Sequence, residues 1–337
     1  MLMAPFTMMT LVRCSLTASF SSLSRLEKIE SITNPKSSTV KLFKALQTKR
    51  KRRVDEGATI IEGHRLVMDL LMNDEERHKE NRETLVKNII LSNKALSHKE
   101  YGSKLKHLLE TCHLRSDPPR ISLGTDDVIS QCCDTVTPQG IVAICSTLPP
   151  FESIDVLAEN RSKPSLYLLL DGVSDPGNVG TLLRSAVAVG VKGVILLPGS
   201  CDVWAPKSIR SGMGATFKVP TRSVSSFEEA LHLLDECGVE RQAIYAATME
   251  SEKKESQDIP STSSLPHYQV DWCVPSALCL GQEGNGLSDI VRDRVKNGEI
   301  SSVHVPMQPG IESLNAAVCG SIIMFEHFRQ SATSQSR

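Results

Sequence analysis

Five short apolar runs mark the second half of the chain, and each is continuous rather than alternating with polar residues. They occupy residues 166–170, 194–197, 243–247, 277–280 and 303–305. Continuous runs are typical of parallel strands buried on both faces of a sheet, whereas half-exposed strands alternate. With helical spacing between the runs, the pattern predicts an α/β domain at residues 165–329, built on a parallel sheet covered by helices.

The first half of the chain alternates shorter strand-like and helix-like segments. Strands are predicted at residues 58–61, 86–91 and 140–145, and helices at 62–71 and 95–110. Alternating elements of this kind predict a small α/β domain at residues 35–148.

Polar stretches mark the other predicted boundaries. Residues 149–164 contain three prolines and are predicted to form a linker. Residues 249–275 hold Glu, Lys, Ser and Pro with little apolar content, which predicts a surface insertion in the second domain. Residues 330–337 are predicted to be a disordered tail.

Residues 1–34 have the composition of a targeting segment. The first acidic residue is Glu27, and two arginines, five serines and three threonines precede it. An acid-poor, Ser-rich start predicts an organellar transit peptide, and the alternative is an ordinary disordered terminus. A mitochondrial destination is expected, while the small number of arginines leaves a plastid open.

Composition excludes several classes of protein. Of the 337 residues, 40% are hydrophobic and 23% charged, as in globular proteins. Every apolar run is far shorter than the roughly 18 residues needed to cross a bilayer, so no membrane segment is predicted. The ten cysteines lack Cys-x-x-Cys spacing, and His-Glu-x-x-His and EF-hand patterns are missing. We therefore expect no metal site and reduced cysteines.

A local patch of positive charge stands out against a net charge of −1. Between residues 41 and 53, seven of thirteen positions are basic and none is acidic. A patch of this kind is a candidate site for nucleic-acid phosphates, and the alternative is an ordinary solvated surface. Its densest part comprises Lys49, Arg50, Lys51, Arg52 and Arg53.

Three segments rich in Gly, Pro and Asn follow predicted strands of the second domain, at the sheet edge where ligands bind in open α/β folds. In the first, residues 171–180, Asn178 is suited to cap the helix that follows. Arg184, about a turn and a half into that helix, could hold a phosphate or carboxylate. The alternative is a capped helix with an incidental arginine.

The second segment, residues 279–287, has three glycines within six residues, beginning at Gly281. This spacing indicates close approach of the backbone to a ligand, although a tight loop explains it equally well. The third segment, residues 303–315, opens an apolar helix with Ser313 and Asn315 at its start. Apolar residues surround most of that helix from 313 to 328, which indicates burial against more than one surface, with burial within its own domain as the alternative.

Together these segments resemble the signature motifs of the SpoU/TrmH family of the SPOUT RNA methyltransferases. Asp-Pro-x-Asn-x-Gly-x-x-x-Arg, Gly-x-Glu-x-x-Gly and Pro-Met-x₅-Ser-Leu-Asn occur in the family's order. Residues 60–67, which include Arg65, and residues 134–141 resemble the family's N-terminal RNA-binding domain. One departure is visible, because many members have glycine where Pro309 stands, and Gly310 comes one place later here.

The resemblance implies a fold, a cofactor and a reaction. The second domain would be a SPOUT domain with a trefoil knot, binding S-adenosylmethionine through Gly281, Val305 and Leu314, and no metal would be needed. It would methylate a ribose 2′-hydroxyl of RNA, with organellar rRNA as the expected substrate. It would act as a homodimer joined through the C-terminal domain. The alternatives are a tRNA or base methyltransferase of the same superfamily, or a non-catalytic RNA-binding ribosome assembly factor.

The resemblance also implies roles for the motif residues. Arg184 matches the arginine assigned to activating the hydroxyl, but a guanidinium is a poor base. We therefore expect Arg184 to stabilise the developing alkoxide and to hold a phosphate. The implied supporting residues are Asn178, Glu283, Ser313 and Asn315, and the implied RNA contacts are Arg65 and the patch at 49–53.

Overall fold

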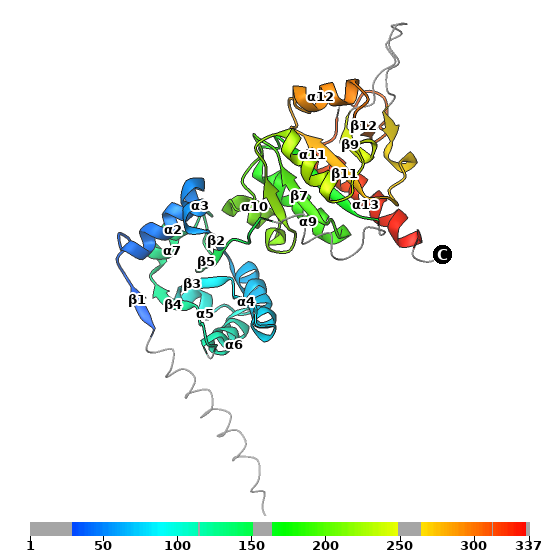
Figure 1. The fold of residues 1–337 in the computed structure, drawn as a ribbon. Helices are drawn as coiled ribbons and strands as arrows, with labels where there is room; N and C mark the ends of the chain where they lie inside the picture. Colours follow the sequence, from blue (N-terminus) through cyan, green and yellow to red (C-terminus); the bar gives the residue numbers. More distant parts are fainter. Residues whose placement is uncertain (1–28, 114, 151–163, 249–263, 312, 335–337) are drawn as a thin grey trace, which may run out of the picture. The chain divides into compact units, whose positions relative to one another are not determined.

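The computed structural model describes residues 29–113, 115–150, 164–248, 264–311 and 313–334, and the chain divides into two compact units (Figure 1). The first unit ends at Ser146 and the second begins at Thr147. Most of the predicted linker and most of the predicted transit peptide lie outside the described residues. Each unit has its own sheet and its own hydrophobic core.

The first unit is built on a mixed five-stranded sheet in the order β1-β4-β3-β5-β2. Its strands are β1 (Glu30–Ile32), β2 (Ala58–Glu62), β3 (Val86–Leu91), β4 (Arg120–Gly124) and β5 (Ile141–Ser146). β5 runs antiparallel to both of its neighbours, and the other pairs are parallel. The three strands predicted from the apolar pattern form the centre and one edge of this sheet.

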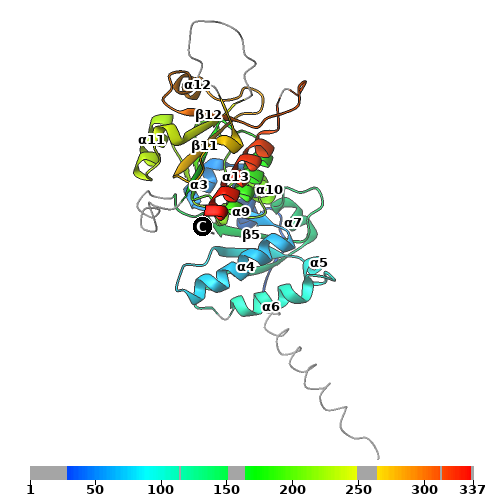
Figure 2. The ribbon, with the colours of Figure 1, turned by 90° about the vertical axis from the view of Figure 1, so that its right-hand side faces the viewer.

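Helices cover both faces of that sheet (Figure 2). They are α2 (Ser38–Thr48), α3 (Arg50–Glu56), α4 (His64–Lys79), α5 (Asn93–Leu96), α6 (Gly102–His113) and α7 (Asp126–Cys132). α2 and α7 bury Phe43, Leu46 and Ile129 against one side of β2, β3 and β5. α4 packs on the other side, with α6 beside it.

The first unit begins earlier than the sequence predicted. β1 lies within the segment assigned to the transit peptide, and it pairs in parallel with β4 from Glu30 to Ile32. The boundary at residue 34 is therefore wrong by several residues. A three-residue strand with one buried side chain carries no periodic signal, so only the pairing reveals it.

The second unit is built on a seven-stranded sheet in which every strand pair is parallel, in the order β10-β12-β9-β11-β6-β7-β8. Its strands are β6 (Leu166–Asp171), β7 (Gly193–Leu196), β8 (Thr221–Ser223), β9 (Ile244–Ala247), β10 (Leu265–Pro266), β11 (Ser276–Gly281) and β12 (Ser301–His304). All five apolar runs form strands, which confirms the predicted parallel α/β sheet. The short edge strands β8 and β10 were not predicted.

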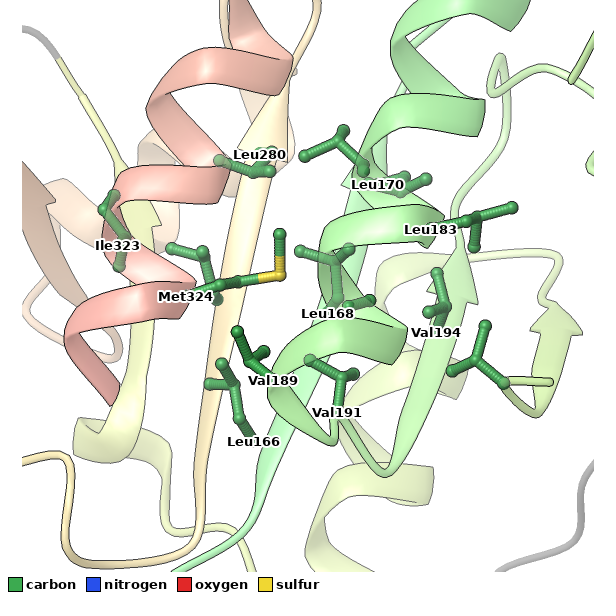
Figure 3. Packing of buried hydrophobic residues seen from close by; sticks show 14 of the residues in the cluster. Leu166, Leu168, Leu170, Leu183, Val189, Val191, Val194, Leu280, Ile323 and Met324 are labelled. Atoms are coloured by element: carbon green, nitrogen blue, oxygen red, sulfur yellow. The ribbon is translucent and has the colours of Figure 1, made fainter. Parts of the chain in front are cut away.

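Helices lie on both faces of this sheet, as expected. α9 (Pro176–Val189), α10 (Pro206–Ser211) and α13 (Ala316–Ser334) lie on one face, and α11 (Phe227–Glu236) and α12 (Asp289–Lys296) on the other. Short 3₁₀ turns occur at Ala215–Phe217, Arg241–Ala243 and His267–Gln269. Along β6, Leu168 faces α9 and α13, while Leu169 faces α11. Figure 3 shows the first of these clusters, where Met324 of α13 joins side chains of α9 and the central strands.

Small residues allow α9, α10 and α13 to pack closely. A Cβ at Gly180 of α9 would overlap the backbone of α10 at Ser208, and one at Gly320 of α13 would overlap Leu280 of β11. The hydroxyls of Ser185 and Ser321 lie 2.8 Å apart and join α9 to α13. This close packing holds in place the two helices that follow the first and third motifs.

The structure corrects two predictions in the C-terminal half. The described part of the predicted insertion, residues 264–275, is more than a surface segment, because it forms β10 and buries Trp272 completely, although Tyr268 stays 54% exposed. The predicted disordered tail is helical as far as Ser334, and the Gln330 side chain donates to the carbonyl of Val270 (3.0 Å) and accepts from the Trp272 amide (3.0 Å). One buried aromatic residue thus orders a stretch that is polar on average.

Two other expectations concern the chain as a whole. Among the described residues, no helix is both long and apolar enough to cross a membrane, and every cysteine there is free. The trefoil knot stays a prediction.

Candidate active site

The three motif segments follow β6, β11 and β12 at the carboxyl edge of the parallel sheet. β6 and β11 are neighbours, and Asp171 lies opposite Gly281 where both strands end. β12 lies two strands from β11, beyond β9. Because parallel strands end at the same edge, segments far apart in the sequence come close together here.

The start of α9 differs from the prediction. Asp175, not Asn178, caps the helix, and its Oδ2 accepts a hydrogen bond from the backbone N–H of Asn178 (2.9 Å). Pro176 occupies the first helical position, which favours this start because its fixed φ suits a helix. Asn178 is therefore within the first turn, and its side chain is available for contacts outside the helix.

One residue from each motif joins a hydrogen-bonded triangle. The side-chain amides of Asn178 and Asn315 both donate to Oε1 of Glu283. The Asn315 amide also donates to Oδ1 of Asn178, at 3.1 Å. The triangle therefore connects three loops whose members are separated by 32 to 137 residues in the chain.

Asn315 has a second structural role. Its Oδ1 accepts hydrogen bonds from the backbone N–H groups of Ala317 (2.9 Å) and Val318 (3.2 Å), so it caps α13. One side chain thus fixes the start of α13 and joins it to the triangle. Ser313, also expected at the site, is exposed and makes no hydrogen bond with the described residues.

Arg184 is exposed on α9, six residues beyond Asn178 and about 9 Å further along the helix axis. Within the described part of the chain it forms no hydrogen bond and no ion pair. It lies more than two turns into the helix rather than the turn and a half expected. The structure therefore does not bring Arg184 into contact with the triangle, but an exposed guanidinium of this kind is suited to bind an anion.

The glycine-rich loop after β11 turns back on itself. The backbone groups of Gln282 and Gly286 exchange two hydrogen bonds of 2.8 Å, and Gly286 has a φ of +69°. A Cβ at Gly281 would overlap the backbone of Gly286 and Leu287. The tight turn of the loop therefore requires glycine at position 281, which agrees with the tight-loop alternative. Contact between Gly281 and a cofactor stays a prediction.

Asp171 anchors the far end of this loop and was missed as a separate residue. It is buried, and its Oδ2 accepts from the backbone N–H of Ser288 at 2.6 Å. This contact ties the end of β6 to the start of α12. An acidic residue that directly follows five apolar strand residues was the available signal.

The third loop has the backbone and side chains to suit a nucleoside. Gly310 has a φ of +90°, so the glycine after Pro309 supplies the left-handed conformation there. Val305 and Leu314 are half-buried apolar residues at the two ends of the loop. Apolar side chains beside amide groups fit an adenosine cofactor such as S-adenosylmethionine. Among the described residues, no cluster of His, Cys, Asp or Glu is arranged to hold a metal ion.

The basic patch of the first unit is smaller than predicted. Arg53 is buried, and its guanidinium donates to the carbonyls of Leu46 (2.7 Å) and Gln47 (3.2 Å) at the end of α2, so it is not a free RNA contact. Arg52 pairs with Glu56 at 2.6 Å. α3 turns back against α2 after Thr48, and this places Arg53 on the packed side. The other predicted contacts remain exposed: Lys49, Arg50, Lys51 and Arg65.

Known proteins resemble this chain in both sequence and fold. The model of the SpoU rRNA Methylase family matches residues 165–325. The Bacillus subtilis 23S rRNA (guanosine(2553)-2′-O)-methyltransferase RlmP is 30% identical over 309 residues, which cover 90% of this chain and 100% of that protein. An AdoMet-bound rRNA methyltransferase from Sinorhizobium meliloti has a TM-score of 0.68 at 22% identity, covering 89% of this chain and 98% of that one.

The human protein named rRNA methyltransferase 3, mitochondrial, is 32% identical over 228 residues, 58% of this chain and 54% of that protein. This chain thus spans about half the length of such mitochondrial relatives. The parallel sheet with three motif loops at its carboxyl edge defines an α/β protein whose ligand site is expected at that edge. The match to RlmP extends over that protein's whole length, and the chain belongs to the SpoU family.

Proposed function

We propose that this protein transfers a methyl group from S-adenosylmethionine to a ribose 2′-hydroxyl of RNA, with organellar rRNA as the substrate. The observation that carries the proposal is the triangle of Asn178, Glu283 and Asn315, which joins all three motifs. Its Asn178 belongs to α9, the helix that also carries the exposed Arg184. The name of RlmP, a 2′-O-methyltransferase of rRNA, supports the same reaction.

The bound cofactor supplies an electrophilic methyl group on a sulfonium. The loops that carry Gly281, Val305 and Leu314 would hold it, largely through backbone groups. Transfer requires the attacking oxygen to lie in line and close, so fixed loop geometry is a major part of catalysis. The triangle provides that geometry, because it ties the loop after β11 to the starts of α9 and α13.

Arg184 acts on the charge that develops during the reaction. A guanidinium is a poor base, so Arg184 stabilises the alkoxide and holds the adjacent phosphate rather than removing the proton. Phosphate-assisted transfer of the hydroxyl proton fits this arrangement. The exposed hydroxyl of Ser313 is available to orient the ribose.

The C-terminal helix carries an apolar face that suits a homodimer. Val318, Ile322, Phe325 and Phe328 are 36–50% exposed, whereas Ile323 and Met324 of the same helix are fully buried in the core. Exposure of four large apolar residues on one helix contradicts burial only within its own domain. We therefore propose that a second copy of the chain covers this face.

Alternative targets and roles make different demands on the site. A base methyltransferase commonly clamps an extruded base between aromatic or apolar side chains, and the motif loops contain no aromatic residue. A non-catalytic RNA-binding factor would not need an intact triangle or an unpaired Arg184. The tRNA alternative shares this chemistry and differs only in substrate.

A mitochondrial location is proposed from the acid-poor N-terminal sequence and from the mitochondrial relatives, with a plastid as the alternative.

The position of the transferred methyl group tests the proposed reaction. RNA methylated with labelled cofactor is hydrolysed in alkali, which cleaves by attack of the 2′-oxygen on the adjacent phosphate. A 2′-O-methyl group blocks that attack, so label is expected in an alkali-resistant dinucleotide. Label found only in mononucleotides would identify base methylation and overturn the proposal.

Exposed charges at the start of α3 should contribute to RNA affinity through phosphate contacts. Changing Lys49, Arg50 and Lys51 together to Gln is expected to reduce the slope of log K against log salt by about 2–3, since each contact contributes about 0.7–0.9. The change should leave cofactor affinity unaltered. Arg53→Gln is unsuited to this test because it would disturb the end of α2. An unchanged slope would show that α3 is only a solvated surface.

A further inference from the structure

Three aromatic rings form a cluster in the first unit, in which Tyr101 stacks on both His64 and His98, while the two histidine rings are tilted by 42°. His64 begins α4, while His98 and Tyr101 lie between α5 and α6. The ring centroids are 4.8 Å apart for His64 and His98, 5.6 Å for His64 and Tyr101, and 5.1 Å for His98 and Tyr101. The planes of His98 and Tyr101 are inclined by only 21°. α4, α5 and α6 lie on the same side of the unit (Figure 2).

The inner ring is a fixed base for the stack. His64 is buried, with Nδ1 3.4 Å from Oε1 of Gln139 and Nε2 3.3 Å from the carbonyl of Ala95. Its backbone N–H donates to the same Gln139 oxygen at 2.9 Å. Gly63 donates to the carbonyl of Ile141 at 3.1 Å. The two segments that resemble an RNA-binding domain therefore meet directly beneath the rings.

The outer rings are held in position while they remain open to solvent. Nδ1 of His98 accepts from the backbone N–H groups of Glu100 and Tyr101, both at 3.3 Å, which fixes the imidazole. The Glu100 carboxylate is hydrogen-bonded to the Tyr101 hydroxyl and raises the pKa of Tyr101, so the phenol stays neutral. His98 is exposed and Tyr101 half-exposed. A purely structural stack would not need this exposure.

Positive charge surrounds these rings. Arg65 is exposed next to His64, and it is close enough to Tyr101 for its charge to act on the hydroxyl. Lys94 and Lys99 are also exposed in the same loop region, and the nearby Glu100 is already engaged. Fixed aromatic faces with basic side chains beside them are typical of proteins that bind unpaired nucleotides.

We propose that His98 and Tyr101 form a ring platform on which one unpaired RNA base stacks, with Arg65 contacting the neighbouring phosphate. The choice of RNA as ligand rests on the proposed function. Bases within a duplex are already stacked on each other, so the platform takes single-stranded loops or ends. The expected substrate is therefore an RNA with an unpaired nucleotide near the methylated one.

Two probes of equal charge separate base stacking from phosphate binding. One is a fluorescent 12-nucleotide oligouridine, and the other is a ribose-phosphate chain of the same length without bases. The full chain is expected to bind the first about tenfold more tightly, from stacking of one base. His98→Ala combined with Tyr101→Ala should remove that preference. His98→Phe combined with Tyr101→Phe should restore it, and Arg65→Gln should lower the salt slope for both probes by about 0.7.

Two outcomes would overturn the platform. The double alanine variant could bind both probes as tightly as the wild type does. It could instead lose affinity for both probes equally, so that the preference stays, which would mean that the rings only support the fold. Failure of the proposed function is measured separately, by absence of methyl transfer from S-adenosylmethionine. A wild-type chain that prefers the base-bearing probe but methylates no RNA would retain the platform and refute the proposed reaction.

Discussion

Arg184→Ala is expected to lower the rate of methyl transfer about 10²–10³-fold, or about 2.7–4 kcal/mol, the usual effect of removing one donor that stabilises transition-state charge. The affinity for S-adenosylmethionine should be unchanged, since the proposed cofactor contacts come from the loops after β11 and β12. Stability should also be unchanged, because Arg184 is exposed and forms no hydrogen bond or ion pair within the described residues. Label transfer to rRNA from cells lacking the protein, together with calorimetry of cofactor binding, measures these effects.

Two control variants sharpen this prediction. Arg184→Lys keeps the charge but loses the planar fork, so an intermediate rate is expected if phosphate geometry contributes. Arg222→Ala removes an arginine from the edge strand β8, three strands from β11, and should leave transfer unaffected. Near-normal transfer by Arg184→Ala would refute the role of this residue, and loss of cofactor binding would assign it to a different part of the site.

The second unit is expected to lose about 2.5 kcal/mol of its unfolding free energy between pH 7.5 and pH 4.5 through His327 alone. His327 lies on the core side of α13, 4% exposed, and burial lowers its pKa to about 4. The unfolded chain binds a proton near the ordinary pKa of 6.5, whereas the folded chain excludes it until about pH 4. Stability therefore falls as pH drops through this interval.

Urea unfolding followed by tryptophan fluorescence reports on the second unit, because Trp204 and Trp272 are the two tryptophans of the chain and both lie there. His327→Leu should remove about 2.5 kcal/mol of the pH dependence. His232→Gln, which alters an exposed histidine of α11, is the matched control and should remove none. Equal pH dependence in wild type and His327→Leu would mean that His327 gains a proton in the folded chain as easily as in the unfolded one.

The triangle and its support have different physical roles. Glu283 and Asn315 are exposed, so hydrogen bonds between them exchange with water and contribute little to stability. The helices that carry Asn178 and Asn315 are held by packing in the core. Gly180, Gly320 and the paired hydroxyls of Ser185 and Ser321 allow α9, α10 and α13 to pack closely. Substitution of Glu283 should therefore affect activity more than folding, whereas substitution of Asn315 would also remove the cap of α13.

Features that depend on local pattern were predictable from the chain. Continuous apolar runs reveal parallel strands because both faces of each strand are buried, and all five runs form strands. The motif residues were also visible, since Gly and Pro after a strand mark the loops that carry Asn178, Glu283 and Asn315. Strands of two or three residues, such as β1, β8 and β10, were missed because they are too short to show a period.

Features that depend on contacts between distant residues required the structure. Asp175 rather than Asn178 caps α9, because Pro176 selects the start of the helix and leaves Asn178 free for Glu283. Arg53 belongs to a basic patch in the sequence, but the turn from α2 to α3 buries its guanidinium against the backbone carbonyls of Leu46 and Gln47. In each case the local sequence allows several partners, and tertiary packing selects one.

The sequence by itself determined the parallel α/β class, the order of the motif loops and the chemical groups available at the site, because each is encoded over a few neighbouring residues. Only the tertiary structure decided which groups meet. It joined Asn178, Glu283 and Asn315, left Arg184 without an ion pair or hydrogen bond among the described residues, and buried Trp272, which lies in a polar stretch, in the core. Such choices depend on strand order and helix packing, which connect residues more than 100 positions apart.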